Sequence, residues 1–437
     1  MDQARHQIVI VGGGSAGLEL ATTLGRKLGK KKLADVILID ASRTHIWKPL
    51  LHEVAAGTLD SAEDELEYLA QARWCNFRYR LGRMTGLDRE RQEVCLAPTL
   101  NEEGVEIIPE RRFHYDTLVM AVGSLSNDFG IRGVKQNCLF LDTTAQAERF
   151  QRKLLDCMLK AHTQGTPIVQ GQLDLAIVGA GATGVELAAQ IHHVTRKLAN
   201  YGLDTIDPDK HIRLHLIEAG PRILPALPER LSQAAERELV RLGVTVHVNQ
   251  RVVEISKAGV ITIEGKIIPA AMKVWAAGIK APDFLKDIAG LETNRLNQLV
   301  VTQNLQTTRD ARIFAIGDCA ACPLDDTGKT VPPRAQAAHQ EASTLARTIL
   351  RQLKGLPPLD YHYRDYGSLV AMGHYSTVGN LMGGLMRSMM VSGLTARFVY
   401  LYLYKMHQAA LYGWPRAILI TLLRFLRRGV DPQIKLH

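Results

Sequence analysis

Two copies of one glycine-rich pattern constrain the fold of this chain more than any other feature. The first copy, Gly-Gly-Gly-Ser-Ala-Gly at 12–17, follows a strand-like run at 7–11 and opens a helical run. The second, at 179–184, follows a strand-like run at 175–178 and opens a helical run at 185–198. In the G-x-G-x-x-G pattern the first glycine permits a tight strand-to-helix turn, the second lets backbone approach a pyrophosphate, and the third lets helix pack on strand. Each copy therefore predicts a nucleotide-binding unit.

Each copy is also followed by a second strand-like run that ends in an acid. Asp40 ends the first of these runs and Glu218 the second. A carboxylate at this place can accept hydrogen bonds from ribose hydroxyls, and it repels the 2′-phosphate of NADP, so Glu218 favours NADH. The alternative is that both patterns are ordinary glycine-rich loops. The strand before each pattern, the helix after it and the acid that follows argue against this alternative. We expect an α/β fold with two Rossmann-like dinucleotide-binding domains.

A later strand-like run indicates which nucleotide lies in which domain. Residues 313–318 end in Gly-Asp, where the Asp318 carboxylate can hold the polyol hydroxyls of a flavin. The alternative role for Asp318 is a helix N-cap. Because this run follows the second glycine pattern, the chain returns to its first domain, which we therefore expect to bind FAD. Similar runs that end in glycine lie at 117–123 and 274–278.

The charge of the chain is concentrated at its end. The formal net charge is +9, and residues 385–437 carry eight Lys or Arg against one acid, Asp431. A basic tail on a nearly neutral body does not favour nucleic acid as the partner. No run of 18 apolar residues occurs, so no conventional transmembrane helix is expected, and the first residues do not resemble a signal peptide.

The same tail has the pattern of helices that lie in a membrane surface. In a helical projection, Arg416, Thr421, Arg424, Arg427 and Arg428 share one side, and apolar residues between 418 and 426 occupy the rest. An earlier helix is expected at about 395–411, rich in tyrosine. Apolar faces, basic edges and aromatic residues suit an in-plane membrane helix, with packing on the protein's own core or on a dimer partner as the alternative.

The chain resembles the bacterial type II NADH dehydrogenases, which are single-chain, non-proton-pumping NADH:quinone oxidoreductases. The resemblance covers essentially the whole chain and rests on residues 9–14, 47–55, 181–187 and 274–282, and on Ala-Gln-Ala-Ala-His-Gln at 335–340, similar to the family's A-Q-x-A-x-Q quinone-site motif. It implies FAD in the first domain, NADH in the second and quinone on the opposite face of the flavin ring. It also implies attachment to the cytoplasmic face of the inner membrane and homodimers. The sequence has no calcium-binding loop of the D-x-[DN]-x-[DN]-G type, so calcium regulation is not expected.

The resemblance assigns chemical roles to three side chains. Glu186 lies two residues after the last glycine of the second pattern. Its functional role is a carboxylate between nicotinamide and flavin, and its alternative is an acid that complements the helix dipole. Gln336 and Gln340 share one helix face and could donate hydrogen bonds to quinone carbonyls, or could simply form a polar helix surface. Pro332-Pro333 can start their helix and so aim its N-terminal amides at the flavin.

The candidate site therefore has three sets of residues. The predicted catalytic residues are Glu186, Gln336 and Gln340. The predicted FAD-binding residues are Gly12, Gly14, Ser15, Ala16, Gly17, Asp40, Ala41, Lys48, Ala121, Gly123, Asp318, Ala335 and Gln336. The predicted NADH-binding residues are Gly179, Gly181, Thr183, Gly184, Glu186, Glu218, Ala277 and Gly278. Lys48 has the alternative of a solvated surface charge.

Cys319 and Cys322 form the only C-x-x-C pair. One pair supplies two ligands, whereas a structural zinc site needs four, so no metal site is expected. We interpret the pair as incidental, with thiol redox or copper binding as the alternative.

We expect an FAD-binding domain from 1–145 and 295–384, an NADH-binding domain at 146–294 and membrane-association helices at 385–437. The predicted function is hydride transfer from NADH to FAD, followed by two-electron reduction of a membrane quinone to quinol without proton pumping. The alternatives are a soluble NADH-dependent flavin reductase with another acceptor and a nucleotide-sensing flavoprotein. Loss of turnover with the physiological acceptor after deletion of 385–437 would argue against the soluble reductase. Rapid flavin bleaching by NADH would argue against the sensor.

Overall fold

The computed structural model describes residues 5–325, 328–372, 376–383, 386–392 and 405–427. The chain forms two compact units. Unit 1 comprises Met1–Trp47, Glu65–Leu125 and Ile279–Asp365, and unit 2 comprises Lys48–Asp64, Ser126–Gly278 and Tyr366–His437. The division into folding domains expected from the sequence stays a prediction.

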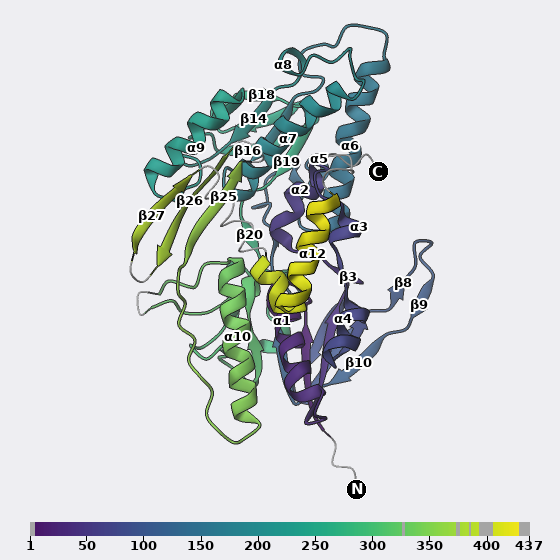
Figure 1. Cartoon of the computed structure of the whole chain (residues 1–437), viewed down its shortest axis with the longest axis vertical. Helices are drawn as coiled ribbons and strands as arrows, with labels where there is room; N and C mark the ends of the chain where they lie inside the picture. The colour runs from purple at the N-terminus through teal and green to yellow at the C-terminus, as the bar shows by residue number, and fades with distance from the viewer. Residues whose placement is uncertain (1–4, 326–327, 373–375, 384–385, 393–404, 428–437) are drawn as a thin grey trace. The chain divides into compact units, whose positions relative to one another are not determined.

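Unit 1 is built on a six-stranded sheet. Its strand order is β22 (Gln306–Thr307), β23 (Asp310–Ala315), β11 (Thr117–Met120), β1 (His6–Val11), β2 (Ala34–Asp40) and β5 (Arg78–Leu81). All neighbours except β22 and β23 pair in parallel. The central strands β1 and β11 are apolar and almost entirely buried, as expected for parallel strands covered on both faces. Figure 1 shows α1 (Ser15–Leu24) beside α10 (Ala335–Gln352), two helices that pack against each other.

The remaining elements of unit 1 are short. They are the π-helical turn Gly25–Gly29 after α1, β3 (Thr44–His45), β4 (Leu66–Glu67), α4 (Tyr68–Cys75), β6 (Met84–Asp88), β7 (Glu93–Leu96), β8 (Thr99–Leu100), β9 (Glu106–Ile108), β10 (Arg111–His114), β20 (Ile279–Lys280), β21 (Leu299–Val300), β24 (Ala320–Ala321) and the 3-10 turns Asp283–Leu285, Ile288–Gly290 and Gly317–Cys319. Strands β6, β7 and β10 form a three-stranded antiparallel sheet.

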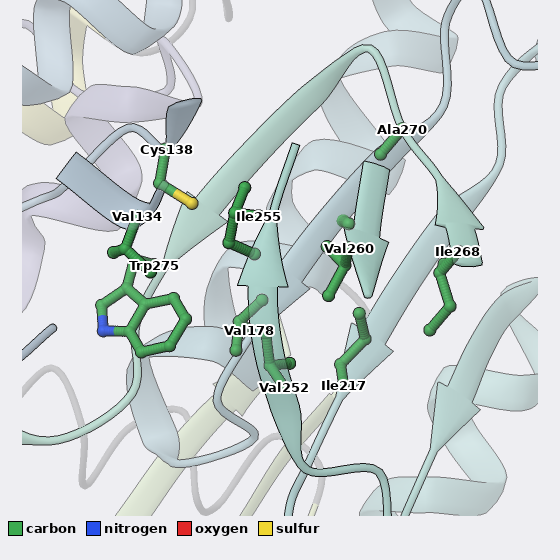
Figure 2. Close-up of a cluster of buried hydrophobic side chains, with 11 residues drawn as sticks. Val134, Cys138, Val178, Ile217, Val252, Ile255, Val260, Ile268, Ala270 and Trp275 are labelled. Carbon is green, nitrogen blue, oxygen red and sulfur yellow. The ribbon is translucent and has the colours of Figure 1, made fainter. Parts of the chain in front are cut away.

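Unit 2 repeats the plan with a four-stranded parallel sheet. Its strand order is β15 (Val244–His247), β14 (Leu214–Ile217), β13 (Leu175–Val178) and β19 (Met272–Trp275). The long helix α7 (Ala182–Asn200) packs against β13 and β14. A three-stranded antiparallel sheet packs on this core through the apolar cluster of Figure 2, in which the Trp275 indole lies at one end. Its strands are β16 (Val252–Ile255), β17 (Gly259–Thr262) and β18 (Ile267–Pro269).

The other elements of unit 2 are mostly helical. They are the 3-10 turn Lys48–Leu50, α2 (Leu51–Ala55), α3 (Ser61–Asp64), α5 (Val134–Asn137), α6 (Thr144–Thr163), α8 (Pro208–His211) and α9 (Glu229–Arg241). Helix α6 begins with a side-chain cap, because the Thr143 hydroxyl accepts from the Gln146 N–H. Helix α2 packs against both α6 and α7.

The C-terminal part of unit 2 contains a sheet that the sequence analysis missed. Strands β25 (Gly367–Met372), β26 (Ser376–Gly383) and β27 (Met386–Ser392) form an antiparallel sheet, and β26 packs against α9 (Figure 1). Residues 386–392 of the segment expected to be helical therefore form a strand. Helix is present at 405–412 and in α12 (Trp414–Arg427). Of the helix predicted at 395–411, residues 395–404 lie outside the described residues, as do Arg428 and Asp431.

Within the described part of the chain, no helix combines the length and the hydropathy that crossing a bilayer requires.

Candidate functional site

The first glycine-rich turn has the geometry that a bound pyrophosphate requires. Gly12 has φ +103°, and a Cβ there would lie 2.3 Å from the Ala121 carbonyl oxygen. A Cβ on Gly17, in the first turn of α1, would lie 1.9 Å from the Gly12 oxygen. By contrast, a Cβ on Gly14 would meet no atom within 4 Å. The turn is therefore closed on the protein side and open only at its second glycine, where a ligand could approach.

The second turn repeats this geometry in unit 2. Gly179 has φ +104°, and its Cβ would lie 2.7 Å from backbone atoms of Ala276 and Ala277. A Cβ on Gly184 would lie 1.9 Å from the Gly179 oxygen, while one on Gly181 would meet no atom within 4 Å. In both units the turn leaves the strand at which the sheet order reverses, β1 beside β11 and β13 beside β19. Parallel α/β sheets bind ligands at this switch point.

The two acids stabilise their own turns. One Asp40 oxygen accepts from the Gly13 N–H at 2.6 Å and the other from the Ser42 N–H at 2.7 Å. Burial raises the pKa of Asp40, and these N–H donors oppose the shift. The Glu218 oxygens accept in the same way from the N–H groups of Ala180 and Gly220. Each carboxylate oxygen has a further lone pair, so the ribose contacts predicted from the sequence stay open.

Most other predicted contacts cluster around the two turns. Ser15 and Ala16 begin α1, Thr183 is the second residue of α7, and Ala41 directly follows β2. Gly123 has φ +69° and no atom within 4 Å of its Cβ position. The Ala277–Gly278 turn is held by Trp275, whose indole N–H donates to the carbonyls of Asn127 and Ala277 at 2.8 and 3.0 Å.

Asp318 is not a helix N-cap, which removes the alternative role considered above. It lies in the 3-10 turn Gly317–Cys319, which has no side-chain cap, and its Oδ2 accepts from the Ser124 hydroxyl at 2.7 Å. Glu341 holds this turn from α10, since its Oε2 accepts from the Gly317 N–H at 2.5 Å. Burial raises the pKa of Glu341 to about 8.

Glu341 is a site residue for which the sequence predicted no role. Its position was visible in the apolar spacing, because Ala337, Ala338, Glu341, Ala342 and Leu345 lie on one buried face of α10.

Helix α10 begins at Ala335, directly after the Pro-Pro-Arg run, as expected. Both glutamines of the motif face the same segment of chain. The Gln340 amide donates to the Arg364 carbonyl at 2.8 Å and accepts from the Arg364 N–H at 3.0 Å. The Gln336 amide donates to Asp365 Oδ1 at 3.2 Å. Both glutamines therefore have a structural role in holding residues 364–365. Their contact with quinone stays a prediction.

Glu186 is the one predicted catalytic residue that titrates, and its pKa is shifted strongly. It is the fifth residue of α7 and only 7% exposed. Its Oε1 accepts from the Ala371 N–H of β25 at 3.0 Å, and its Oε2 lies 3.6 Å from His52 Nδ1. Burial raises its pKa to about 8, the Ala371 N–H opposes the shift, and the nearby Glu53 charge adds to it. At neutral pH this carboxyl is therefore mostly protonated, which suits a proton donor better than a dipole-complementing anion.

His52 is a second residue of this cluster to which the sequence analysis assigned no role. It lies in α2 and is 2% exposed. Burial lowers its pKa to about 4, so the imidazole is neutral, and a hydrogen bond to the Pro49 carbonyl opposes this shift. Among the described residues, its Nε2 has no hydrogen-bond partner. No local pattern identifies a histidine of this kind, because its burial is set by α6 and α7.

The positions of Lys48 and of the cysteine pair do not by themselves indicate a chemical role. Lys48 Nζ lies 3.8 Å from Asp142 Oδ1 in unit 2, with its side chain 42% exposed. Cys319 and Cys322 are buried, free thiols, and burial raises the pKa of each to about 12. Thiols with this pKa are poor nucleophiles and poor metal ligands. In the described part of the chain, no group of three or more His, Cys, Asp or Glu could hold a metal ion.

Comparison with known proteins places these features in one family. Residues 6–342 match the model of the pyridine nucleotide-disulphide oxidoreductases. The chain is 44% identical to a type II NADH:quinone oxidoreductase of Haemophilus influenzae, over 98% of this chain and 99% of that protein. It is 30% identical to the type II NADH:quinone oxidoreductase NdhA of Mycobacterium tuberculosis, over 94% and 86%. The structure of NDH2 from Plasmodium falciparum in complex with NADH matches 99% of this chain and 100% of that one, with TM-score 0.80 and 20% identity, and so shows the same fold.

Proposed function

This chain belongs to the pyridine nucleotide-disulphide oxidoreductases and, within them, to the type II NADH:quinone oxidoreductases, and we propose that it is a respiratory enzyme that transfers hydride from NADH to FAD and reduces a membrane quinone to quinol without proton pumping. The observation that carries this proposal is the pair of glycine turns, each open to a ligand only at its second glycine. One chain thus offers two dinucleotide sites.

The residues of unit 1 fit FAD. The opening above Gly14 and the N-terminus of α1 suit a pyrophosphate, because unpaired N–H groups and the helix dipole favour negative charge there. Asp40 would hold the ribose, and Asp318, kept in place by Ser124 and by Glu341 through Gly317, would hold the flavin polyol. FAD, when bound, supplies the hydride acceptor and the electron donor for quinone.

The residues of unit 2 fit NADH. Gly181 and the first residues of α7 would bind the pyrophosphate, and Glu218 would accept from the ribose hydroxyls. The same carboxylate would repel the 2′-phosphate of NADP. The Ala277–Gly278 turn, which Trp275 holds in place, would position the nicotinamide end.

Glu186 and the two glutamines act on the substrates in this proposal. Glu186 is buried and mostly protonated at neutral pH, so it can hold a proton ready for the reduced quinone. Gln336 and Gln340 would donate hydrogen bonds to quinone carbonyls, because a neutral side-chain amide supplies N–H donors without placing a charge in an apolar channel.

The chain would meet its quinone at the lipid surface. Helix α12 exposes Trp414, Ile418, Leu419, Leu422 and Leu423, each by more than half of its area. A helix with such an apolar surface and neighbouring arginines can lie in the plane of an anionic membrane. We place it peripherally on the cytoplasmic side of the inner membrane, in a homodimer.

A stopped-flow experiment tests this function. Under anaerobic conditions NADH should bleach the bound flavin within one turnover, and a water-soluble quinone should then restore the yellow colour. The acceptors ferricyanide and oxygen serve as controls for unspecific reoxidation. The proposal would be contradicted if the chain purified without flavin, or if quinone failed to reoxidise the reduced flavin.

A further inference from the structure

The environment of Glu186 raises a question of proton supply. NADH carries one hydride, so reduction of a quinone to quinol by NADH consumes one additional proton in each turnover. Glu186 can deliver that proton, but its side chain is only 9% exposed and must then be reprotonated from a more accessible group. On the proposed function, on which this inference rests, unit 2 therefore needs a route for protons to Glu186.

Three side chains of unit 2 form a row that provides such a route. Glu53, with a 23% exposed side chain, places Oε1 at 4.0 Å from Nε2 of His52. The opposite ring nitrogen of His52, Nδ1, lies 3.6 Å from Glu186 Oε2. We propose that His52 relays protons from Glu53 to Glu186.

The two ring nitrogens are suited to opposite tasks. Nε2 is buried and has no hydrogen-bond partner among the described residues, so the hydrogen bond of the ring to the Pro49 carbonyl uses Nδ1. Nδ1 thus carries the resting proton, and Nε2 presents a free lone pair toward Glu53. An orphaned buried acceptor is costly, and a proton donor arriving at Nε2 removes that cost.

The transfer balances one proton in and one proton out. Glu53 takes a proton from solvent and passes it to Nε2, while Nδ1 releases its proton to the Glu186 carboxylate. The imidazole ends neutral in the other tautomer, with its proton on Nε2. The starting tautomer returns by proton exchange with water, in which Nε2 loses one proton and Nδ1 gains one. Both gaps exceed a direct hydrogen bond by about 1 Å, which small side-chain rotations can close during turnover.

Neighbouring elements add charges that any pH experiment must consider. Lys48, just before α2, lies 3.8 Å from Asp142. Glu148 of α6 accepts from the Ser61 hydroxyl. The strand β25 contributes the Ala371 N–H, and the buried face of α6, formed by Ala147, Phe150 and Leu154, is apolar.

The first test replaces the relay with an amide that cannot pass a proton. In the holoenzyme, His52→Gln should slow flavin reoxidation by a water-soluble quinone about tenfold or more and increase its solvent deuterium isotope effect. Flavin reduction by NADH should keep its rate. His192→Gln is the matched control, because His192 is also a buried histidine with a lowered pKa and lies in the same helix as Glu186.

The second test reads the protonation of Glu186 without turnover. The infrared carbonyl band of its protonated carboxyl, assigned with Glu186→Gln, should disappear near pH 8 in the oxidised holoprotein. His52→Gln should leave this midpoint in place, because a neutral histidine contributes no charge. Glu53→Gln should move it to lower pH, because the Glu53 charge raises the pKa of Glu186, and should also slow reoxidation.

The outcomes separate this inference from the proposed function. If the wild-type protein does not reduce quinone, the proposed function fails first. If it does, and His52→Gln or Glu53→Gln reoxidises at the wild-type rate, the relay is wrong. Equal slowing of both half-reactions in His52→Gln, or a lost flavin, would show a structural role and would also overturn the relay.

Discussion

The second glycine of the NADH turn offers a substitution that should weaken nucleotide binding while leaving stability nearly unchanged. Gly181 is the residue before α7, with φ −71° and ψ −174°, a conformation that alanine adopts freely. A Cβ there would meet no protein atom within 4 Å. Gly181→Ala should therefore be tolerated by the fold, and its methyl group should occupy the space that we assign to the pyrophosphate.

The cost to binding follows from the geometry of the turn. A phosphate oxygen bound to a backbone N–H lies about 2.9 Å from the nitrogen. A carbon–carbon bond of about 1.5 Å placed in this opening would displace the pyrophosphate by roughly 1 Å. Losing one charge-assisted hydrogen bond of about 1.5–3 kcal/mol would raise the dissociation constant of the nucleotide by about 10- to 150-fold.

Stability should change little, because alanine is a poorer N-cap than glycine and this cost offsets the gain from a less flexible unfolded chain. Replacing a glycine by alanine in an allowed conformation restricts the unfolded chain and stabilises by about 0.4–1 kcal/mol. Gly184→Ala is the contrasting variant, since its Cβ would lie 1.9 Å from the Gly179 oxygen and 3.4 Å from Ile177 Cγ2. Helix α7 would have to move away from β13, at a cost of about 1–3 kcal/mol.

Both quantities can be measured without turnover. Calorimetric titration with NAD⁺ gives the affinity, thermal unfolding gives the stability, and the flavin absorbance confirms that the other turn is intact. Gly181→Ala should lose affinity without loss of thermal stability, whereas Gly184→Ala should lose both. If Gly181→Ala binds NAD⁺ as tightly as the wild-type protein, the pyrophosphate does not lie over this glycine and the reasoning from the open turn is refuted.

Three further predictions concern charge and the tail. The pKa of Glu341 in the folded protein, about 8, lies above its ordinary value, so the stabilising contribution of the protonated carboxyl is lost as the pH rises through about 8. Between about pH 6 and about pH 9, Glu341→Gln should therefore lose less thermal stability than the wild-type protein. The ion pair of His339 with Glu19 raises the pKa of His339, so His339→Gln should cost about 1 kcal/mol or less in acid, and the difference should vanish at alkaline pH. Leu419→Asp on α12 should weaken binding to phosphatidylglycerol vesicles about tenfold or more in sedimentation assays. The charge-matched Thr421→Asp should weaken binding less. Equal effects of the two variants would show that α12 does not enter the membrane.

Local sequence predicted the nucleotide turns well because their geometry is local. The spacing of the glycines within each turn is set by steric limits on a few consecutive residues, and the structure has those limits at Gly12, Gly17, Gly179 and Gly184. The strands before each turn and the helices after it were predicted for the same reason. The antiparallel sheet of β25, β26 and β27 was not, although its strands pair with their neighbours in sequence, because the packing of side chains on the faces of a sheet decides strand formation more than local preference does.

The amino-acid sequence by itself determined two βαβ turns, the acids that follow them and the family to which the chain belongs, since all of these are carried by residue types at short, regular spacing. Only the tertiary structure decided the chemistry around Glu186. Its partners His52 and Ala371 come from segments far away in the chain, the latter 185 residues away. Burial by those segments, rather than any neighbour in sequence, raises the pKa of Glu186 and lowers that of His52, because desolvation depends on everything packed around a group.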